Sequence, residues 1–348
     1  LLVTAGMSQI ALAGDSVYVN TSSLRYRTSA QIKDNNIAGN LSYGQKLERV
    51  GTSGQWTMIL LNGKKYYVSS AYVTSKKPAS AGAVQTTSQT AAGAQTSGGT
   101  AIALSSNYKY ANYSKINSGT ATLYRSTASN KKNKVVCVNA GHGTNGGGSV
   151  KTQCHPDGSA KVTGGTTGAG ATSAVAVSSG MTFADGTAES KVTLAMAKVL
   201  KTKLLNAGYD VLMIRESDDV QLDNIARTVI ANNNADCHIA LHWDSTSSNK
   251  GAFFMSVPSN ATYRAMEPVA SHWKQHNQLG ESLISGLKSA GVKIYSKGSM
   301  EMDLTQTSYS TIPSVDIELG DKASDHSGAT LETLANGLLT GVNTFFGQ

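Results

Sequence analysis

The sequence predicts an α/β domain, with a mostly parallel sheet flanked by helices, that follows a small all-β module. Three observations carry this prediction. From residue 134 onward, short apolar runs alternate with segments of helical period. Residues 14–75 consist instead of short alternating segments with glycines between them, including the hairpin signal Asn62-Gly63. Residues 76–133 lack a clear apolar period, so we expect a flexible linker there.

The start of the chain resembles the end of a secretory signal. An apolar stretch leads to Ala11-Leu12-Ala13 before Gly14, the small-x-small pattern that a signal peptidase requires. A short N-terminal strand or helix is the alternative. We expect residues 1–13 to be a signal-peptide remnant and the protein to be secreted, and no apolar run is long enough to span a membrane.

The all-β module is the basic part of the chain. Residues 14–77 carry nine Lys/Arg and three Asp/Glu, which is +6 of the net charge of +8. A basic module on an exported protein suits an anionic polymer such as bacterial wall, although a basic face is often only solvated. Its short strands at regular spacing predict a small barrel.

The α/β domain opens with a strand at 134–139 and a long insertion, 143–188, rich in Gly, Thr and Ser. A helix follows, because one stripe holds Val192, Met196, Val199, Leu200 and Leu204. Gly208 ends that helix. The later elements are expected at 209–215 (strand), 222–235 (helix), 236–244 (strand), 268–290 (helix), 314–320 (strand) and 328–345 (helix). This alternation predicts helices on both faces of the sheet.

The loop after the first strand has two interpretations. Gly141, Gly143 and Gly146 have the spacing of a dinucleotide-binding fingerprint, with His142 among them. A phosphate site requires a helix directly after the glycines and an acidic residue about 20 residues further on. Neither is present. We therefore expect the loop to present His142, and no nucleic-acid partner is expected.

Four groups typical of metal sites fall at one edge of the expected sheet. His142 follows one strand, while His242 and Glu318 end two others. Glu189 opens a helix in the same layer. The carboxyl ends of parallel strands share an edge, and zinc binds imidazole and carboxylate groups through three protein ligands in catalytic sites. His238 lies roughly 13 Å from His242 along the strand, so only one of them can be a ligand.

Two other pairs are weaker candidates for metal binding. Cys154 and His155 are adjacent, and adjacent residues rarely converge on one ion, so we expect a surface loop. His272 and His276 share a helix face at i, i+4 spacing. Their helix lies between strands, away from the expected edge.

At these residues the sequence resembles the zinc-dependent N-acetylmuramoyl-L-alanine amidases of the amidase_3 type. The landmarks follow the family's order from Val135 to Phe346: "NAGHG", "AES", "MIRESDD", "LDNIARTVIANNNAD", "HIALHWD" and "SVDIELG". The resemblance implies that residues 134–348 form an amidase catalytic domain that binds Zn²⁺. Position by position, it implies that the zinc ligands are His142, Glu189 and His242 and that the catalytic glutamate is Glu318.

The implied reaction is hydrolysis of the amide between N-acetylmuramic acid and L-alanine in peptidoglycan, as in autolysins and phage lysins. The chain departs from the family at Asn139 and Ala140, where an Asp and a Pro are usual, and in its long insertion. Because the segment from about Gly146 to Gly180 contains none of the three implied ligands, we expect the insertion to form a wall of the substrate cleft and to be dispensable for metal binding.

The front module is similar to bacterial SH3 domains, which commonly bind peptidoglycan. The similarity rests on "LRYRTSA", on "GQW" around Trp56 and on "GKKYYVSSAYV". It implies a wall-binding SH3-like domain at 14–75 and a secreted, cell-wall-associated protein with peptidoglycan as its partner. Another zinc hydrolase of the wall, a deacetylase or peptidase, remains an alternative, as does a wall-binding protein without catalysis.

Overall fold

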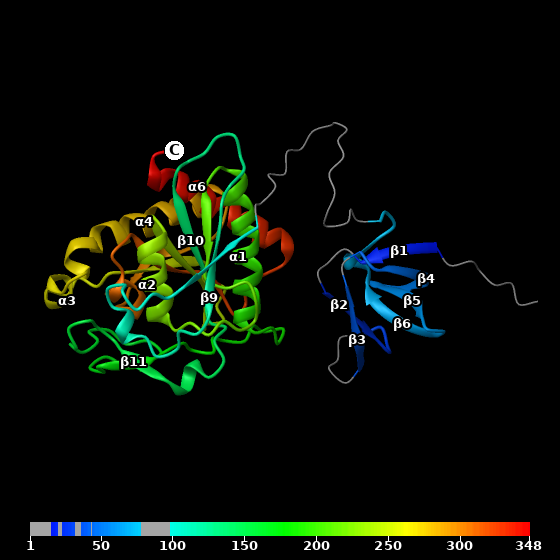
Figure 1. Ribbon diagram of the computed structural model, residues 1–348, viewed down its shortest axis with the longest axis horizontal. Helices are drawn as coiled ribbons and strands as arrows, with labels where there is room; N and C mark the ends of the chain where they lie inside the picture. The colour runs from blue at the N-terminus through cyan, green and yellow to red at the C-terminus, as the bar shows by residue number, and fades with distance from the viewer. Residues whose placement is uncertain (1–14, 20–22, 32–35, 43, 78–97) are drawn as a thin grey trace, which may run out of the picture. The chain divides into compact units, whose positions relative to one another are not determined.

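The computed structural model describes residues 15–19, 23–31, 36–42, 44–77 and 98–348. The chain forms two compact units, residues 1–90 and 91–348, and each is described by itself (Figure 1). The expected signal-peptide remnant, residues 1–13, lies outside the described residues, as does much of the expected linker, residues 78–97.

The first unit is a seven-stranded sheet in the order β3-β2-β6-β5-β4-β1-β7. Its strands are β1 (Asp15–Val19), β2 (Ser23–Arg27), β3 (Ile37–Ser42), β4 (Lys46–Ser53), β5 (Trp56–Leu61), β6 (Lys64–Ser69) and β7 (Val73–Thr74). All recorded pairings are antiparallel. Asn62 and Gly63 have φ values of 51° and 73° and join β5 to β6, as the hairpin signal predicts. The all-β character is confirmed, and the SH3-like barrel stays a prediction.

The second unit contains an eight-stranded sheet in the order β16-β15-β17-β14-β10-β13-β9-β8. Its strands are β8 (Thr100–Ala103), β9 (Thr120–Tyr124), β10 (Val135–Ala140), β13 (Asp210–Met213), β14 (Cys237–Asp244), β15 (Ala252–Ser256), β16 (Ile294–Glu301) and β17 (Ser314–Asp321). The central strands β17, β14, β10 and β13 are parallel. They bring the ends of β10, β14 and β17 to one edge.

The sheet is mixed, whereas the sequence predicts a mostly parallel one. β15 runs antiparallel to β17, because the connection from β14, residues 245–251, is too short for a helical crossover. At the other side, β9 pairs antiparallel with β13, and β8 with β9. These two strands lie inside the segment 76–133 that was expected to be a linker, so the α/β unit begins before residue 134.

Helices cover both faces of the sheet. They are α1 (Glu189–Asn206), α2 (Asn224–Asn234), α3 (Ala261–Ala265), α4 (Val269–Ser289), α5 (Thr305–Tyr309) and α6 (Gly328–Phe346). Val138 packs in one cluster with residues of α1, α4 and α6, while its neighbour Cys137 packs with residues of α2. Neighbouring strand residues point to opposite faces, which confirms the expected α/β layering (Figure 1). None of the helices in the described part of the chain combines the length and apolar character needed to cross a bilayer.

The insertion between β10 and α1 is fastened to the α/β unit. It contains a 3-10 turn (Gly147–Ser149) and a hairpin of β11 (Lys151–Gln153) with β12 (Ser173–Val175). Asp303, which is fully buried, accepts hydrogen bonds from His155 Nε2 (3.0 Å), Val162 N (2.8 Å) and Thr163 N (3.0 Å). Lys161 also pairs with this carboxylate. One buried acceptor therefore holds the middle of the insertion in place.

Candidate metal centre

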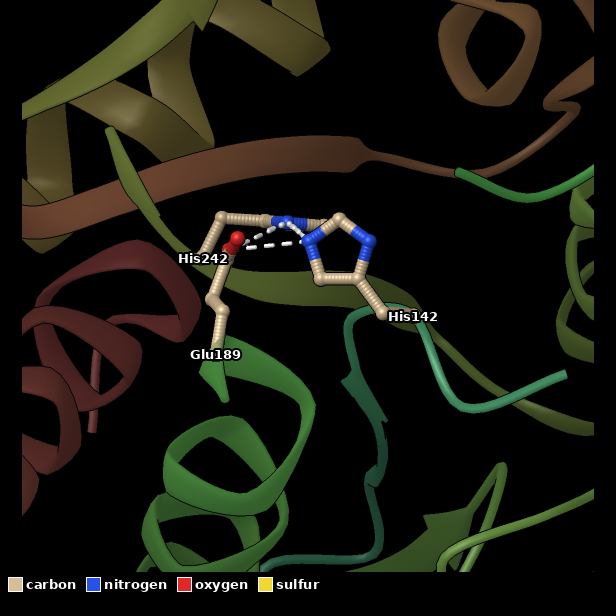
Figure 2. A group of neighbouring side chains, drawn as sticks. All are labelled: His142, Glu189 and His242. Atoms are coloured by element: carbon tan, nitrogen blue, oxygen red, sulfur yellow. Dashed lines mark hydrogen bonds and ion pairs between the residues drawn. The ribbon is translucent and has the colours of Figure 1, made fainter. Parts of the chain in front are cut away.

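Three of the residues singled out in the sequence converge on one point. His142 Nε2 lies 2.9 Å from Glu189 Oε1 and 3.1 Å from His242 Nδ1. His242 Nδ1 lies 3.2 Å from Glu189 Oε1. Figure 2 shows the three side chains approaching from the loop after β10, the start of α1 and strand β14. In the described part of the chain, this is the one group of three or more His, Cys, Asp or Glu residues close enough to share an ion.

The glycine loop serves this convergence and not a phosphate. A Cβ on Gly141 would lie 2.2 Å from Cε1 of His242, so only glycine allows that ring to lie against the loop. His142 has a φ of 63°, which turns its side chain out of the strand direction. After Gly146 the chain makes a single 3-10 turn and continues into β11. No helix begins there to bind a phosphate.

Backbone groups orient two of the three side chains. Nδ1 of His142 donates to the carbonyl oxygen of Ser178 at 2.9 Å, so Nε2 presents its lone pair to the cluster. Glu189 Oε1 accepts from Trp243 N at 3.0 Å, and Oε2 accepts from Met181 N at 2.8 Å. Each orientation is fixed by a hydrogen bond to the main chain.

The end of the insertion packs directly on these ligand candidates. Gly180 has a φ of +81°, and a Cβ there would lie 2.7 Å from His142 Cδ2 and 2.8 Å from Glu189 Oε2. Ser178 supplies the acceptor for His142. These contacts argue against the expectation that the insertion is dispensable for metal binding, because its last residues support two candidate ligands.

The three groups together suit a cation. A nitrogen lone pair of His142 and a carboxylate oxygen face the same point, an arrangement that is favourable only when a positive charge lies between them. The separations of 2.9 to 3.2 Å approach the edge of roughly 3.3 Å expected for tetrahedral ligands with bonds of about 2.0 to 2.1 Å. Two imidazoles and a carboxylate are a donor set typical of zinc.

Charge in the cluster is strongly coupled. Burial alone would raise the pKa of Glu189, but the adjacent imidazoles of His142 and His242 bring that pKa well below its usual range. Burial lowers the pKa of His242, and Asp316 and Glu189 outweigh it and raise the pKa to about 10.

Glu318 lies beside the cluster. Strand β17 pairs with β14 so that Glu318 is opposite His242. The side chain is 9% exposed, and its Oε2 is buried without a hydrogen-bond partner among the described residues. Burial and the neighbouring Asp316 raise the pKa of Glu318 well above its usual value. A carboxyl group whose charged form is disfavoured in this way binds a proton more readily than one in water.

Sequence reasoning missed Asp316. Its Oδ2 lies 3.6 Å from His242 Nε2, and its side chain shares the cavity with Glu318. The signal was present: Asp316 and Glu318 are two residues apart and alternate with the apolar Val315, Ile317 and Leu319, a spacing that places both on one face.

A cavity of about 500 Å³ opens onto these groups. The insertion lines it with Lys161, Gly165–Thr167 and Ser178–Met181. Residues 304–306, at the start of α5, line it as well. The expectation that the insertion shapes a cleft agrees with this lining.

The alternative histidines lie outside the cluster. His238 is fully buried, and neither of its nitrogens has a hydrogen-bond partner among the described residues. His272 Nδ1 donates to the Pro268 carbonyl at 2.8 Å, and His276 Nδ1 accepts from Ser314 N at 2.9 Å. None of them joins the metal cluster found in the described chain.

His155 does not form a metal site with Cys154. Its contacts are structural. Its Nδ1 lies 2.9 Å from Ser159 Oγ, and its Nε2 lies 3.0 Å from Asp303. The order Ser159, His155, Asp303 resembles the nucleophile, base and acid of a catalytic triad. The ring is 1% exposed, however, and Asp303 is the anchor of the insertion. We therefore assign these contacts to anchoring.

Residues 136–335 match the family model Amidase_3, N-acetylmuramoyl-L-alanine amidase. Among solved structures, the amidase Ami1 from Mycobacterium smegmatis is 20% identical with a TM-score of 0.47, over 63% of this chain and 99% of that one. The N-acetylmuramoyl-L-alanine amidase of Clostridium difficile 630 is 16% identical with a TM-score of 0.44, over 62% and 97%. AmiC2 of Nostoc punctiforme is 15% identical with a TM-score of 0.44, over 63% and 99%. A comparison with curated proteins finds no match.

Proposed function

Because the chain belongs to the Amidase_3 family of N-acetylmuramoyl-L-alanine amidases, we propose that its α/β unit is a zinc-dependent peptidoglycan amidase. The bond hydrolysed is the amide between the lactyl group of N-acetylmuramic acid and L-alanine. The observation that carries the metal dependence is the convergence of His142, Glu189 and His242 within 3.2 Å of one another. That donor set is typical of a zinc site with an open position.

His142, Glu189 and His242 hold the ion in this proposal. When bound, Zn²⁺ supplies Lewis acidity that lowers the pKa of water and polarises a carbonyl group. Glu318 accepts the proton of the attacking water and then delivers it to the nitrogen of the departing alanine. Its buried Oε2 has no competing hydrogen bond within the described residues, which leaves that oxygen available for proton transfer.

The surroundings suit a large polymeric substrate. Hydroxyl and amide side chains line the cavity, among them Thr166, Thr167, Ser179 and Gln306. They match the polar sugar and peptide groups of a muropeptide. We further propose that residues 14–75 bind the wall as an SH3-like module. Their net charge supports attraction to an anionic polymer, and tethering raises the local concentration of the enzyme on an insoluble substrate. The protein would then be secreted and act at the cell wall, as a host autolysin or a phage lysin.

Mass spectrometry of fragments released from purified peptidoglycan tests the function. The expected result is a new free amine on L-alanine together with an intact lactyl carboxylate. This product should be absent with His142→Ala, and wild type stripped of metal by a chelator should form it again when zinc is added. Released acetate would favour a deacetylase, and cleavage between amino acids would favour a peptidase. If the protein binds the wall but releases no fragments, only the alternative of a wall-binding protein without catalysis would remain.

A further inference from the structure

The two histidines of the cluster face it with different ring nitrogens. His142 uses Nε2, and its Nδ1 donates to the Ser178 carbonyl at 2.9 Å. His242 uses Nδ1, so its Nε2 points away from the cluster. The charged group facing Nε2 is Asp316, whose Oδ2 lies 3.6 Å away. A histidine that ligates a metal usually donates its other N–H to an acceptor, which fixes the ring and its tautomer.

Asp316 is placed for this role by the register of the sheet. On β17 it pairs with Ala240 of β14, two residues before His242. Its side chain is 15% exposed, and Oδ1 is buried without a hydrogen-bond partner among the described residues. A largely buried carboxylate with an unsatisfied oxygen costs stability unless it faces positive charge. The neighbouring cluster is where that positive charge belongs.

We propose that Asp316 is a positioning residue of the metal centre, which accepts the Nε2–H of His242 and keeps Nδ1 directed at the ion. A movement of ~0.6 Å closes the present separation to hydrogen-bond length. The proposal rests on the proposed zinc dependence of the enzyme.

The test is a set of zinc affinities, measured on the full chain by competition with a chromophoric chelator. Asp316→Leu removes the acceptor and the charge, so zinc should bind 10-fold to 100-fold more weakly. Asp316→Asn keeps an acceptor oxygen without the charge and should give an intermediate loss. Asp244→Asn is the matched control, because Asp244 also lines the cavity but pairs with Lys250 instead of His242. Its zinc affinity should stay within about threefold of wild type.

A second readout reports the tautomer. In zinc-loaded protein with ¹⁵N-labelled histidine, His242 should carry its proton on Nε2, and that signal should shift or broaden in Asp316→Leu. Melting of the metal-free variants shows whether each is folded. Should Asp316→Leu be unfolded, the comparison is made with Asp316→Asn.

Three results would overturn the proposal. Folded Asp316 variants with wild-type zinc affinity would remove the positioning role. Intact zinc affinity with a large fall in turnover would place Asp316 in the chemistry itself. An equal loss of zinc in Asp244→Asn would show that general charge, and not contact with His242, holds the ion. Failure of the wild type to bind zinc is a different outcome, which contradicts the proposed function along with the inference.

Discussion

The carbonyl oxygen of Ser178 lies 2.9 Å from Nδ1 of His142, so a segment that follows the first ligand candidate by 36 positions also orients it. Met181 makes the equivalent contact to Glu189 through its backbone N–H. The insertion consequently supports the candidate metal centre as well as lining the cavity.

Replacement of Glu318 separates a proton acceptor from a metal ligand. Glu318→Gln preserves the shape of the side chain, but an amide does not accept a proton from water near neutral pH. Turnover should fall by about a hundredfold or more, with zinc content near that of wild type. Turnover, metal analysis and a melting curve on one preparation check this. Normal turnover would remove Glu318 from the chemistry, and loss of zinc would make it a ligand.

Gly180→Ala should weaken zinc binding by about tenfold or more, because the added Cβ would press on His142 and Glu189. Gly186→Ala is the control. Gly186 has a similar φ of +86°, but nothing lies within 4 Å of its Cβ position, so this variant carries only backbone strain of about 1 to 2 kcal/mol. Chelator competition and melting temperature are measured for both. Equal zinc affinities in the two variants would mean that the contact with the ligands is unimportant.

Two deletions divide the insertion by function. Removal of Gly146–Gly180 should abolish tight zinc binding, since Ser178 and Gly180 are lost with it. Removal of residues 156–170, combined with Asp303→Asn to avoid a buried unpaired charge, keeps both residues and should retain zinc while cleavage of peptidoglycan changes. Zinc retained by the longer deletion would show that the Ser178 contact does not support the site.

Two buried histidines should make the fold sensitive to acid. Burial lowers the pKa of His238 and of His276 to about 3, whereas both titrate near 6.5 in the unfolded chain. As pH falls from about 6.5 towards 3, the unfolded state binds protons that the folded state does not, so stability decreases by up to roughly 1.4 kcal/mol per pH unit for each group.

His276→Gln isolates one of these contributions. A glutamine retains an acceptor for Ser314 N, and it does not titrate. Urea unfolding at pH 7 and pH 5 should show a smaller loss of stability in this variant than in wild type. His272→Gln is the control, since His272 lies on the same helix and is only partly buried. An unchanged difference between the two pH values would contradict the assignment to His276.

Deletion of residues 14–75 tests the modular organisation. Sedimentation with wall material should weaken, while turnover of a soluble muropeptide should be preserved, because all the candidate ligands lie in the unit of residues 91–348. A collapse of turnover on the soluble substrate would mean that the two units do not function independently.

The parts of the site that were predictable are those with a side-chain signal. His142, His242 and Glu318 each follow or end an apolar run, and Glu189 begins a helix with a clear apolar stripe, so topology alone brings them to one edge. The supports of the site were not predictable in this way. Ser178 and Met181 act through backbone atoms in a Gly/Ser/Thr-rich segment, where periodicity carries no information about which carbonyl or N–H faces a ligand.

The fold shows the same division. Long elements with strong periods, such as α1 and β14, were placed to within a few residues. Strand β16 was missed because it contains Ser296 and Gly298 at φ values of 49° and 85° and has mostly polar, exposed side chains. Strands β8 and β9 were missed because they are short and stand in a largely polar segment, where only a few residues such as Ala121 are buried.

The contacts of Ser178, Gly180 and Met181 couple the binding of an ion at the candidate site to the order of the cavity wall. Linkage is reciprocal: a segment that favours the ligand geometry is itself stabilised by whatever occupies it, by the same free energy. Susceptibility of the 143–188 segment to a protease should therefore report metal occupancy without any substrate present. In the proposed zinc enzyme, chelation should loosen this wall, and loosening of the wall should weaken zinc binding.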